Sequence, residues 1–508
     1  MATLSVAAIL AENARRRPHK EALVEGDLRL TFAEVWQRAL ARAGALTGLG
    51  VRPGDRIALM APNTAEFPQA YFAIAAAGGV VVPVHLLLSA EEVEHVLTDS
   101  AATLLLVHPA QAETGTAAAR AAGVRVITLG EEFARLAADA EPLPSYLTRD
   151  ADDPAVVFYT SGTTGVPKGA VLSHFNLVMN ATVNAFDAND IRPEDIALGA
   201  LPLFHAFGQT VSLNSTWRAG ATLVLLPRFD AARAIELMVR EKVNTFHGVP
   251  TMFVALAAAA GQADALPGLR VCVSGGASLP VAVLERFEAA FGARIYEGYG
   301  LSETSPAAAV NQPVFGARPG TIGHPLWGVD VEIARAEAEG HVELLPPGEL
   351  GEVVIRGHNV FSGYLGRPEA TAEALVDGWF RTGDLGTKDD EGFLRIVDRK
   401  KDVIIRGGFN VYPREVEEVL ARHPGVAQVA VIGLPDELHG EEVCAVVVPA
   451  PGAASDAGQI TEWSKEHLGR HKYPRRVEFA DTLPLGPSMK VLKRELRALY
   501  AQRVPEAR

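Results

Sequence analysis

The sequence predicts an α/β protein with a large N-terminal domain and a small C-terminal domain. At 508 residues the chain is longer than one ordinary domain, so two or three domains are expected. Helical stretches alternate with short apolar runs over the first half of the chain, which is typical of α/β folds. Near Gly320 short alternating strands take over, and five consecutive charged residues follow at residues 398–402. We therefore expect a large domain over residues 1–398, a hinge at 399–402 and a small α+β domain over 403–508.

The first third of the chain alternates helices with buried strands. A helix is predicted over residues 32–49, and strands are predicted over residues 56–60, 79–84, 103–108 and 124–129. Residues 70–88 carry no charge, but Gly78, Gly79 and Pro83 interrupt them. We read this segment as an Ala-rich helix, a glycine stop and a Val-rich buried strand, and we expect no membrane span.

The middle of the chain continues the same pattern. A helix is predicted over residues 176–188, an apolar run over 198–204, an amphipathic helix over 231–242, and strands over 269–273 and 292–296. The last two strands run into Gly-rich turns, at residues 274–277 and 297–304. Strands that end in such turns favour ligand sites at the carboxyl edge of an α/β sheet.

Two further units follow in the sequence. Short alternating strands at residues 329–333, 352–356 and 393–397, separated by Gly/Pro turns, predict a small β-barrel or sandwich inside the large domain. Beyond the charged run, the small domain is predicted to contain a helix over 413–422, strands over 426–433 and 442–448, and a helix over 460–468.

Composition excludes several classes of function. A net charge of −14 and a pI near 5.5 argue against a nucleic-acid-binding protein, since affinity for a phosphate backbone needs a basic surface. Cys272 and Cys444 are the only cysteines, too few for a disulfide framework or a thiolate metal site. The Arg15–Arg17 run follows the apolar N-terminal stretch, whereas a signal peptide has the opposite order. A cytoplasmic location is expected.

The segment around which these elements are arranged reads YTSGTTGVPKG, from Tyr159 to Gly169. Apolar runs flank it on both sides, so it is a loop between buried elements. Its glycines expose backbone N–H groups, its hydroxyls add donors, and Lys168 adds a positive charge, which together suit a polyphosphate. It is not a P-loop, because Lys168 stands between Pro167 and Gly169 rather than before Ser or Thr.

This loop resembles the phosphate loop of the adenylate-forming superfamily, which includes acyl-CoA synthetases, peptide-synthetase adenylation domains and luciferases. Other stretches resemble that superfamily's motifs in the same order, from about Ser5 to Leu496. They read LFHAF at 203–207, SGGA at 274–277, EGYGLSET at 297–304, WFRTGD at 379–384, DRKKD at 398–402, RGGF at 406–409 and GPSMKVLKREL at 486–496. The resemblance implies ATP, Mg²⁺ and coenzyme A as cofactors and a C-terminal domain that moves about the hinge.

The resemblance also implies which residues bind the nucleotide. The phosphates would be held by the loop residues Thr160, Ser161, Gly162, Thr163, Thr164, Gly165 and Lys168. Glu303 with Thr160 would hold Mg²⁺, and Thr304 would lie near the α-phosphate. Asp384 would accept both ribose hydroxyls, since a carboxylate can bind a diol through its two oxygens, and Arg399 would assist. The adenine and acyl walls would be formed by Gly275, Gly276, Ala277, Glu297, Gly298, Tyr299 and Gly300.

The resemblance further implies residues for the chemistry of the acid and for the domain movement that precedes thiol attack. His205 would lie at the carboxylate end of the acyl pocket, and Lys490 would be the catalytic lysine of adenylate formation. Met489 precedes Lys490 where the family often has glycine. Lys401 would be the hinge residue, and Arg406, Gly407 and Gly408 would border the pantetheine tunnel after the small domain has rotated.

The implied activity is that of an AMP-forming acyl-CoA ligase. Residues 201–210 contain no acid to hold an amino group, and Glu297-Gly298 precede Tyr299 where malonate-type ligases have a basic residue. A largely apolar monocarboxylic acid fits best. The tail around Lys490 favours a medium- or long-chain fatty acid, and a 4-coumarate-, cinnamate- or benzoate-type aryl acid is the alternative. A non-catalytic nucleotide- or acyl-binding protein is the weaker alternative, and a homodimer is a further expectation.

Overall fold

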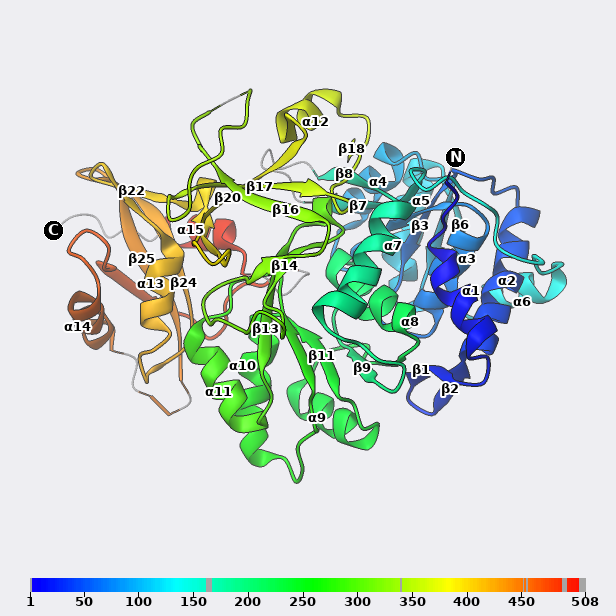
Figure 1. Ribbon diagram of the computed structural model, residues 1–508, viewed down its shortest axis with the longest axis horizontal. Helices are drawn as coiled ribbons and strands as arrows, with labels where there is room; N and C mark the ends of the chain where they lie inside the picture. Colours follow the sequence, from blue (N-terminus) through cyan, green and yellow to red (C-terminus); the bar gives the residue numbers. More distant parts are fainter. Residues whose placement is uncertain are drawn as a thin grey trace.

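The computed structural model describes residues 2–160, 167–338, 340–450, 452–453, 456–486 and 491–501. Over these residues the strands form four sheets. The first α/β sheet lies on the right of Figure 1 and the second in the lower middle, an antiparallel sheet lies in the upper middle above the second, and the C-terminal domain lies on the left. The predicted α/β fold with a large N-terminal and a small C-terminal part is confirmed.

The first α/β sheet has seven strands in the order β18-β8-β7-β4-β3-β5-β6. Its strands are β3 (Arg56–Met60), β4 (Val80–Pro83), β5 (Leu104–Val107), β6 (Arg125–Thr128), β7 (Pro154–Thr160), β8 (Lys168–Ser173) and β18 (Gly363–Tyr364). Strands β3 to β7 pair in parallel, and β8 returns antiparallel to β7. Alternate side chains of β3 enter different hydrophobic cores, so helices cover both faces.

The second α/β sheet has nine strands in the order β15-β14-β13-β12-β11-β9-β10-β1-β2. They are β1 (Glu21–Glu25), β2 (Leu28–Thr31), β9 (Ile196–Gly199), β10 (Thr222–Leu225), β11 (Thr245–Gly248), β12 (Val271–Ser274), β13 (Ile295–Gly300), β14 (Ala307–Val310) and β15 (His324–Pro325). Leu223 and Leu225 of β10 enter the same core as Ile57 and Leu59 of β3. The two α/β sheets therefore share one hydrophobic core.

The helices of the large domain begin where the sequence supplies caps. Thr31, Ser89 and Ser173 each accept a backbone hydrogen bond in a capping box. The helices are α1 (Ala7–Arg16), α2 (Phe32–Gly48), α3 (Glu66–Ala76), α4 (Ala90–Asp99), α5 (Ala112–Ala122), α6 (Glu131–Asp139), α7 (His174–Val183), α8 (Ser215–Ala219), α9 (Ala231–Arg240), α10 (Pro250–Ala259), α11 (Val281–Phe291) and α12 (Pro368–Ala374). Short turns and π-helical segments are η1 (Pro109–Gln111), η2 (Asn184–Ala188), η3 (Phe207–Asn214), η4 (Ala260–Gln262), η5 (Ser302–Thr304) and η6 (Lys400–Asp402).

Three sequence predictions differ from the structure in informative ways. The predicted helix over 176–188 begins earlier, at His174, and continues into the π-helical η2. The apolar run over 198–204 leaves the sheet after Gly199, because it continues as a buried loop rather than as a strand. The residues Glu297–Gly300, predicted as a turn, extend β13: Glu297 pairs with β12, and the next three residues pair with β14 on the other side.

The third sheet of the large domain is antiparallel. Its strands are β16 (Val329–Ala334), β17 (Gly351–Gly357), β19 (Leu375–Val376), β20 (Trp379–Lys388) and β21 (Leu394–Arg399). They are ordered β16-β17-β20-β19, with β21 also paired to β20. The predicted short strands are present, and the sheet they form is open along this order rather than closed into a full barrel.

The small domain is built on a fourth sheet, ordered β23-β22-β25-β24 with β26 paired to β25. Its elements are β22 (Ile404–Arg406), β23 (Phe409–Val411), α13 (Pro413–Leu420), β24 (Val426–Asp436), β25 (Gly440–Pro449), α14 (Ala457–His467), β26 (Arg476–Phe479) and α15 (Lys493–Ala501). Two cores consist only of residues after Val403, one around Val416 and one around Leu496. This unit therefore has hydrophobic cores of its own.

The uncharged segment over residues 70–88 is divided between α3 and β4. Gly78 between them has a φ of 74°, which stops the helix. Among the described residues, no helix is both long and apolar enough to cross a membrane.

Candidate active site

A buried carboxylate stands where the antiparallel sheet meets the end of β13. Asp384, on β20, is 4% exposed. Its Oδ2 accepts a 2.5 Å hydrogen bond from the Tyr299 hydroxyl, and its Oδ1 lies 3.3 Å from the Arg399 Nε. Burial, together with the neighbouring carboxylate, raises the pKa of Tyr299, so the phenol keeps its proton and donates it. The structure thus brings together Tyr299, Asp384 and Arg399 from two predicted motifs and the hinge segment.

A second acid lies near the end of β7. Glu303, in η5, is 7% exposed, and its Oε1 accepts a 2.9 Å hydrogen bond from the Tyr364 hydroxyl. The Thr160 hydroxyl lies 3.5 Å from the same oxygen. Lys168 lies with its Nζ 5.4 Å from the centre of the Tyr364 ring. Because Thr160 and Lys168 face each other across the β7–β8 ladder, this corner gathers a carboxylate, a hydroxyl and a cation.

Several predicted residues lie outside the described residues. These are Ser161, Gly162, Thr163, Thr164, Gly165 and Lys490. Thr160 and Lys168, which flank residues 161–166, are register partners in the β7–β8 ladder. Near the ends of the gap that contains Lys490, Leu485 and Val491 form an antiparallel bridge.

The glycines predicted to line the adenine wall lie where main chains approach closely. A Cβ on Gly275 would stand 3.1 Å from the Phe207 ring and 3.4 Å from the Gly298 oxygen. A Cβ on Gly300 would stand 1.7 Å from the Pro306 oxygen, which leaves no room for a side chain. Gly276 has a φ of 82° and Ala277 is exposed in the turn after β12. This turn and β13 therefore form a wall of small residues beside Tyr299.

His205 lies in the loop between β9 and η3. It lines a small hollow of about 10 Å³ together with Leu201, Pro202, Phe207, Gly208, Val249 and Gly276. The Phe207 amide donates a 3.2 Å hydrogen bond to His205 Nδ1, which leaves that nitrogen as an acceptor. The imidazole is thereby set beside an apolar hollow next to the glycine wall, the place predicted for the acyl pocket.

The side chains of two predicted residues, Thr304 and Glu297, hydrogen-bond to the protein's own backbone. Thr304 is fully buried, and its hydroxyl bonds within the η5 turn, to the Leu301 backbone and the Pro306 oxygen. This hydroxyl therefore already has partners inside its own turn, and the hydroxyls that lie near the Glu303 carboxylate are those of Thr160 and Tyr364. Glu297 directs its carboxylate away from the wall and toward the Leu279 amide, which donates a 3.1 Å hydrogen bond. Burial raises the pKa of Glu297 to about 7.

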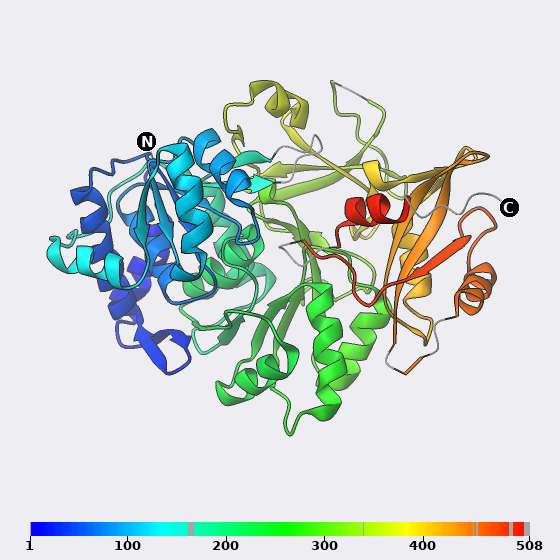
Figure 2. The same cartoon turned by 180° about the vertical axis from the view of Figure 1, so that it is seen from behind.

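The residues predicted to border a pantetheine tunnel lie at the turn between β22 and β23, which stands on the outer side of the small domain and away from β13 (Figures 1 and 2). Arg406 donates two hydrogen bonds to Glu442, of 2.6 and 2.9 Å, and the Gly407 amide donates to the His439 oxygen. Gly407 and Gly408 have φ angles of 56° and 81°. Lys401 is exposed in η6, at the predicted hinge.

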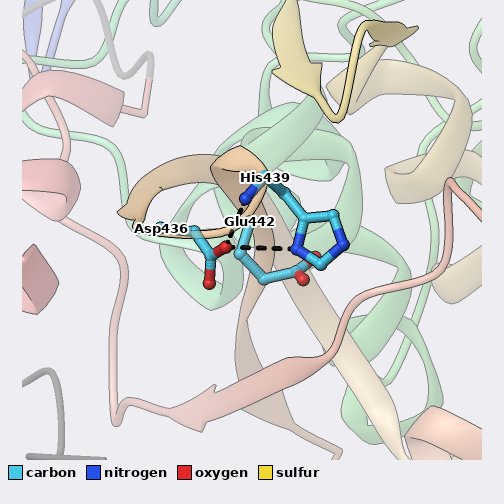
Figure 3. Close-up of side chains that lie close together, drawn as sticks. All are labelled: Asp436, His439 and Glu442. Carbon is cyan, nitrogen blue, oxygen red and sulfur yellow. Dashed lines mark hydrogen bonds and ion pairs between the residues drawn. The ribbon is translucent and has the colours of Figure 1, made fainter.

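The hairpin that holds this turn gathers three potential metal ligands, Asp436, His439 and Glu442 (Figure 3). The Asp436 Oδ1 already accepts from the Leu438 and His439 amides and lies 3.1 Å from His439 Nδ1. Glu442 is bound by Arg406. Since the guanidinium already supplies the positive charge that this group needs, the arrangement fixes a turn rather than an ion.

Sequence reasoning missed Tyr364 and Arg414. Tyr364 bonds to Glu303, and Arg414 of the small domain approaches Glu297. Phe207 was quoted within a motif but given no role, although its ring covers Gly275. Tyr364 stands in a GYLGRPEAT stretch whose aromatic-glycine pattern marks a turn, and nothing local in the sequence points from it to Glu303.

Comparison with known proteins adds to this geometry. The sequence matches the family described as AMP-binding enzyme over residues 10–365, and its C-terminal domain over residues 415–490. A feruloyl-CoA synthase of Amycolatopsis sp. is 42% identical over 491 residues, covering 96% of this chain and 97% of the relative. A long-chain-fatty-acid–CoA ligase of Mycobacterium tuberculosis is 36% identical over 511 residues, covering 98% and 99%. The crystal structure of ATP-bound MatB from Rhodopseudomonas palustris has a TM-score of 0.90, with 34% identity and coverage of 99% and 100%.

Proposed function

Since this chain belongs to the AMP-binding enzyme family, we propose that it joins an aromatic carboxylic acid of the hydroxycinnamate type to coenzyme A. The chain is an AMP-forming acid–thiol ligase that uses ATP and coenzyme A, in a family whose relatives are named CoA ligases and synthases.

The reaction has two half-reactions. The carboxylate oxygen attacks the α-phosphorus of ATP, pyrophosphate leaves, and an acyl-adenylate forms. The thiol of coenzyme A then attacks the acyl carbon, loses its proton, and AMP leaves. The first step depends mainly on placing the carboxylate in line with the leaving group and on stabilising charge at phosphorus. In the proposed mechanism Lys490 bridges the carboxylate and the α-phosphate oxygens.

The ribose is proposed to bind at Asp384. Each carboxylate oxygen has two lone-pair directions, so both can accept from a ribose hydroxyl while keeping their bonds to Tyr299 and Arg399. The adenine would then lie along the wall formed by Gly275 and β13, where the absence of side chains permits a flat ring to approach closely.

A magnesium ion is proposed to bind at Glu303 and Thr160. Mg²⁺ prefers oxygen ligands, and it commonly takes one or two from protein and others from substrate phosphates. The Tyr364 hydroxyl bonds to Glu303 Oε1, and no described residue hydrogen-bonds Oε2. The donor set therefore fits, and the ion when bound would neutralise phosphate charge.

The observation that favours an aromatic acid is the 42% identity to a feruloyl-CoA synthase over 96% of the chain. The hollow beside His205 supports it, because Phe207 lines this hollow and offers an aromatic face on which a planar acid can stack.

A fatty acid is the second candidate. The long-chain-fatty-acid–CoA ligase at 36% identity covers 98% of this chain, and the tail around Lys490 resembles fatty acyl-CoA ligases. We retain residues 1–398 as the proposed catalytic domain, with Lys401 as the proposed hinge residue of the small domain.

The test is CoA-dependent AMP release from ATP with ferulate, 4-coumarate, benzoate, octanoate, palmitate and malonate. We expect ferulate or 4-coumarate to give the highest kcat/KM. A higher value for octanoate or palmitate would replace the aromatic proposal with the fatty-acid one. Absence of acid-dependent release with the whole panel would contradict both candidates.

A further inference from the structure

The first turn of α13 fixes the small domain against the large one through Arg414. Its side chain is 13% exposed, and its Nη1 donates a 2.6 Å hydrogen bond to the Ile396 oxygen on β21. Its backbone amide donates a 2.9 Å hydrogen bond to Asp398 Oδ2. Its Nη2 lies 3.7 Å from the Oε1 of Glu297, on β13. One residue of the small domain thus reaches two strands of the large domain.

Glu297 is the acid at the end of this contact. The residue is 3% exposed, and among the described residues its Oε2 has no hydrogen-bond partner. Arg414 is the one cation that lies within ion-pair distance of it in the described part of the chain. Its carboxylate lines a cavity of about 160 Å³, whose other charged lining residues are Glu288, Arg294 and Arg318. A carboxylate so deeply buried depends on a nearby positive charge to remain ionised.

A second contact lies one turn further along the same helix. The Val281 amide, at the start of α11, donates a 3.3 Å hydrogen bond to Glu418 Oε2. Arg414 and Glu418 are four residues apart, so they lie on one face of α13. That face therefore meets both β13 and the first residue of α11, and Figure 1 places α13 beside α11.

The orientation seen here cannot be the one that serves thiol transfer in the proposed mechanism. The β22–β23 turn, which contains Gly407 and Gly408, stands on the outer side of the small domain (Figure 1), and the Gly407 amide donates to the His439 oxygen of the β24–β25 hairpin. To reach Tyr299 and Asp384 it must rotate inward, which withdraws α13 from β13. Rotation would leave Glu297 buried without its cation, and the loss of that attraction opposes the movement.

We propose that Arg414, acting on Glu297, is a positioning residue that holds the small domain in the orientation for adenylate formation. The assignment rests on the proposed two-step function. The strand that carries Glu297 also carries Tyr299, which holds the ribose-binding Asp384. The orientation of the small domain is thereby coupled to the nucleotide site through a strand shared by both.

The experiment measures the two half-reactions separately in Arg414→Ala, Arg414→Gln and Arg414→Lys. Adenylate formation is followed by acid-dependent ATP–pyrophosphate exchange, and transfer by thioester formation from a supplied acyl-adenylate and coenzyme A. We expect Arg414→Ala and Arg414→Gln to slow ATP–pyrophosphate exchange about tenfold or more, a size typical of the energetic coupling between two sites. The rate of thioester formation should stay within about twofold of the wild-type rate. Lys, which keeps the charge, should recover most of the exchange rate. Arg422→Ala, an exposed arginine just beyond the same helix, is the matched control.

A second measurement does not depend on activity. Hydrogen exchange at the Val281 amide, protected by Glu418, should accelerate about tenfold in Arg414→Ala if the helix face leaves β13 more often. Equal loss in both half-reactions, or unchanged exchange at Val281, would overturn the proposal. If the wild-type enzyme gives no pyrophosphate exchange with any acid, the proposed function fails, whereas the amide measurement still tests the contact.

Discussion

The Tyr299 hydroxyl donates a 2.5 Å hydrogen bond to Oδ2 of Asp384, across 85 residues of sequence. The bond joins the end of an α/β sheet to the antiparallel sheet, and Arg399 approaches the other carboxylate oxygen. Asp384 is therefore held from two sides before any ligand arrives, and its orientation is fixed by groups from separate parts of the fold. Such preorganisation lowers the cost of ordering on binding.

Tyr299→Phe should weaken ATP binding more than it weakens catalysis. A hydrogen bond to a charged group contributes about 1.5–3 kcal/mol, so we expect the KM for ATP to rise about tenfold or more with kcat nearly unchanged. The measurement is pyrophosphate exchange as a function of ATP concentration. Tyr296→Phe, three residues earlier and without a hydrogen bond from its hydroxyl to any described residue, is the control. A change confined to kcat would contradict the assignment.

Glu303→Gln should raise the concentration of Mg²⁺ needed for half-maximal activity. The amide keeps the size of the side chain but removes a negative oxygen ligand, so we expect roughly a tenfold to hundredfold shift, as for other partners of a metal site. Tyr364→Phe should shift the required Mg²⁺ concentration less, because this substitution removes only the hydrogen bond to Glu303 Oε1. EDTA should abolish the activity of both the wild type and the variants. Glu285→Gln, an exposed acid on α11, should leave the Mg²⁺ dependence unchanged.

The sequence predicted those residues of the candidate site that stand in Gly-containing motifs. Gly275, Glu303 and Asp384 stand in motifs with local patterns, and the alternation of helices and strands predicted the sheets that carry them. The hydrogen bonds of Thr304 within its own turn could not be predicted, because no residue pattern distinguishes a hydroxyl that bonds to its backbone from one that contacts a ligand. The partners Tyr364 and Arg414 could not be predicted, since both meet their acids only through tertiary packing.

Lys490→Ala should abolish adenylate formation and largely spare attack on a supplied acyl-adenylate. Removing one preorganised donor to a developing charge slows a reaction about 10²- to 10³-fold, and we expect at least that loss in pyrophosphate exchange. Thioester formation from the purified adenylate measures the second half-reaction. An equal loss in both would show that Lys490 does not act in the first alone. Lys493→Ala is a poor control, because the ion pair of Lys493 with Glu417 joins α15 to α13. Lys465→Ala is used instead, because Lys465 is exposed and forms its ion pair with Glu462 on its own helix, α14.

Glu297→Gln should change how stability depends on pH. The folded pKa of about 7 lies above the usual 4.5, so between these values the folded protein binds a proton that the unfolded chain has released. The wild type therefore loses stability as pH rises from about 4.5 through about 7, by about 3 kcal/mol in total, and the Gln variant lacks this loss. The Tm difference between the two proteins, measured at pH values from about 5 to about 8, gives the result. Parallel pH profiles would contradict the raised pKa.

Phe207→Ala should change which acid is preferred. Phe207 lines the hollow beside His205, and its ring stands against the Gly275 backbone. Removing the ring opens space for a flexible chain and takes away the surface on which an aromatic acid would stack. We expect the ratio of kcat/KM for octanoate to that for ferulate to rise about tenfold to hundredfold. Phe204→Leu changes a buried aromatic residue that does not line the hollow, and it should leave the ratio unchanged. If Phe207→Ala lowers both acids equally, the ring supports the fold of the loop and does not select the acid.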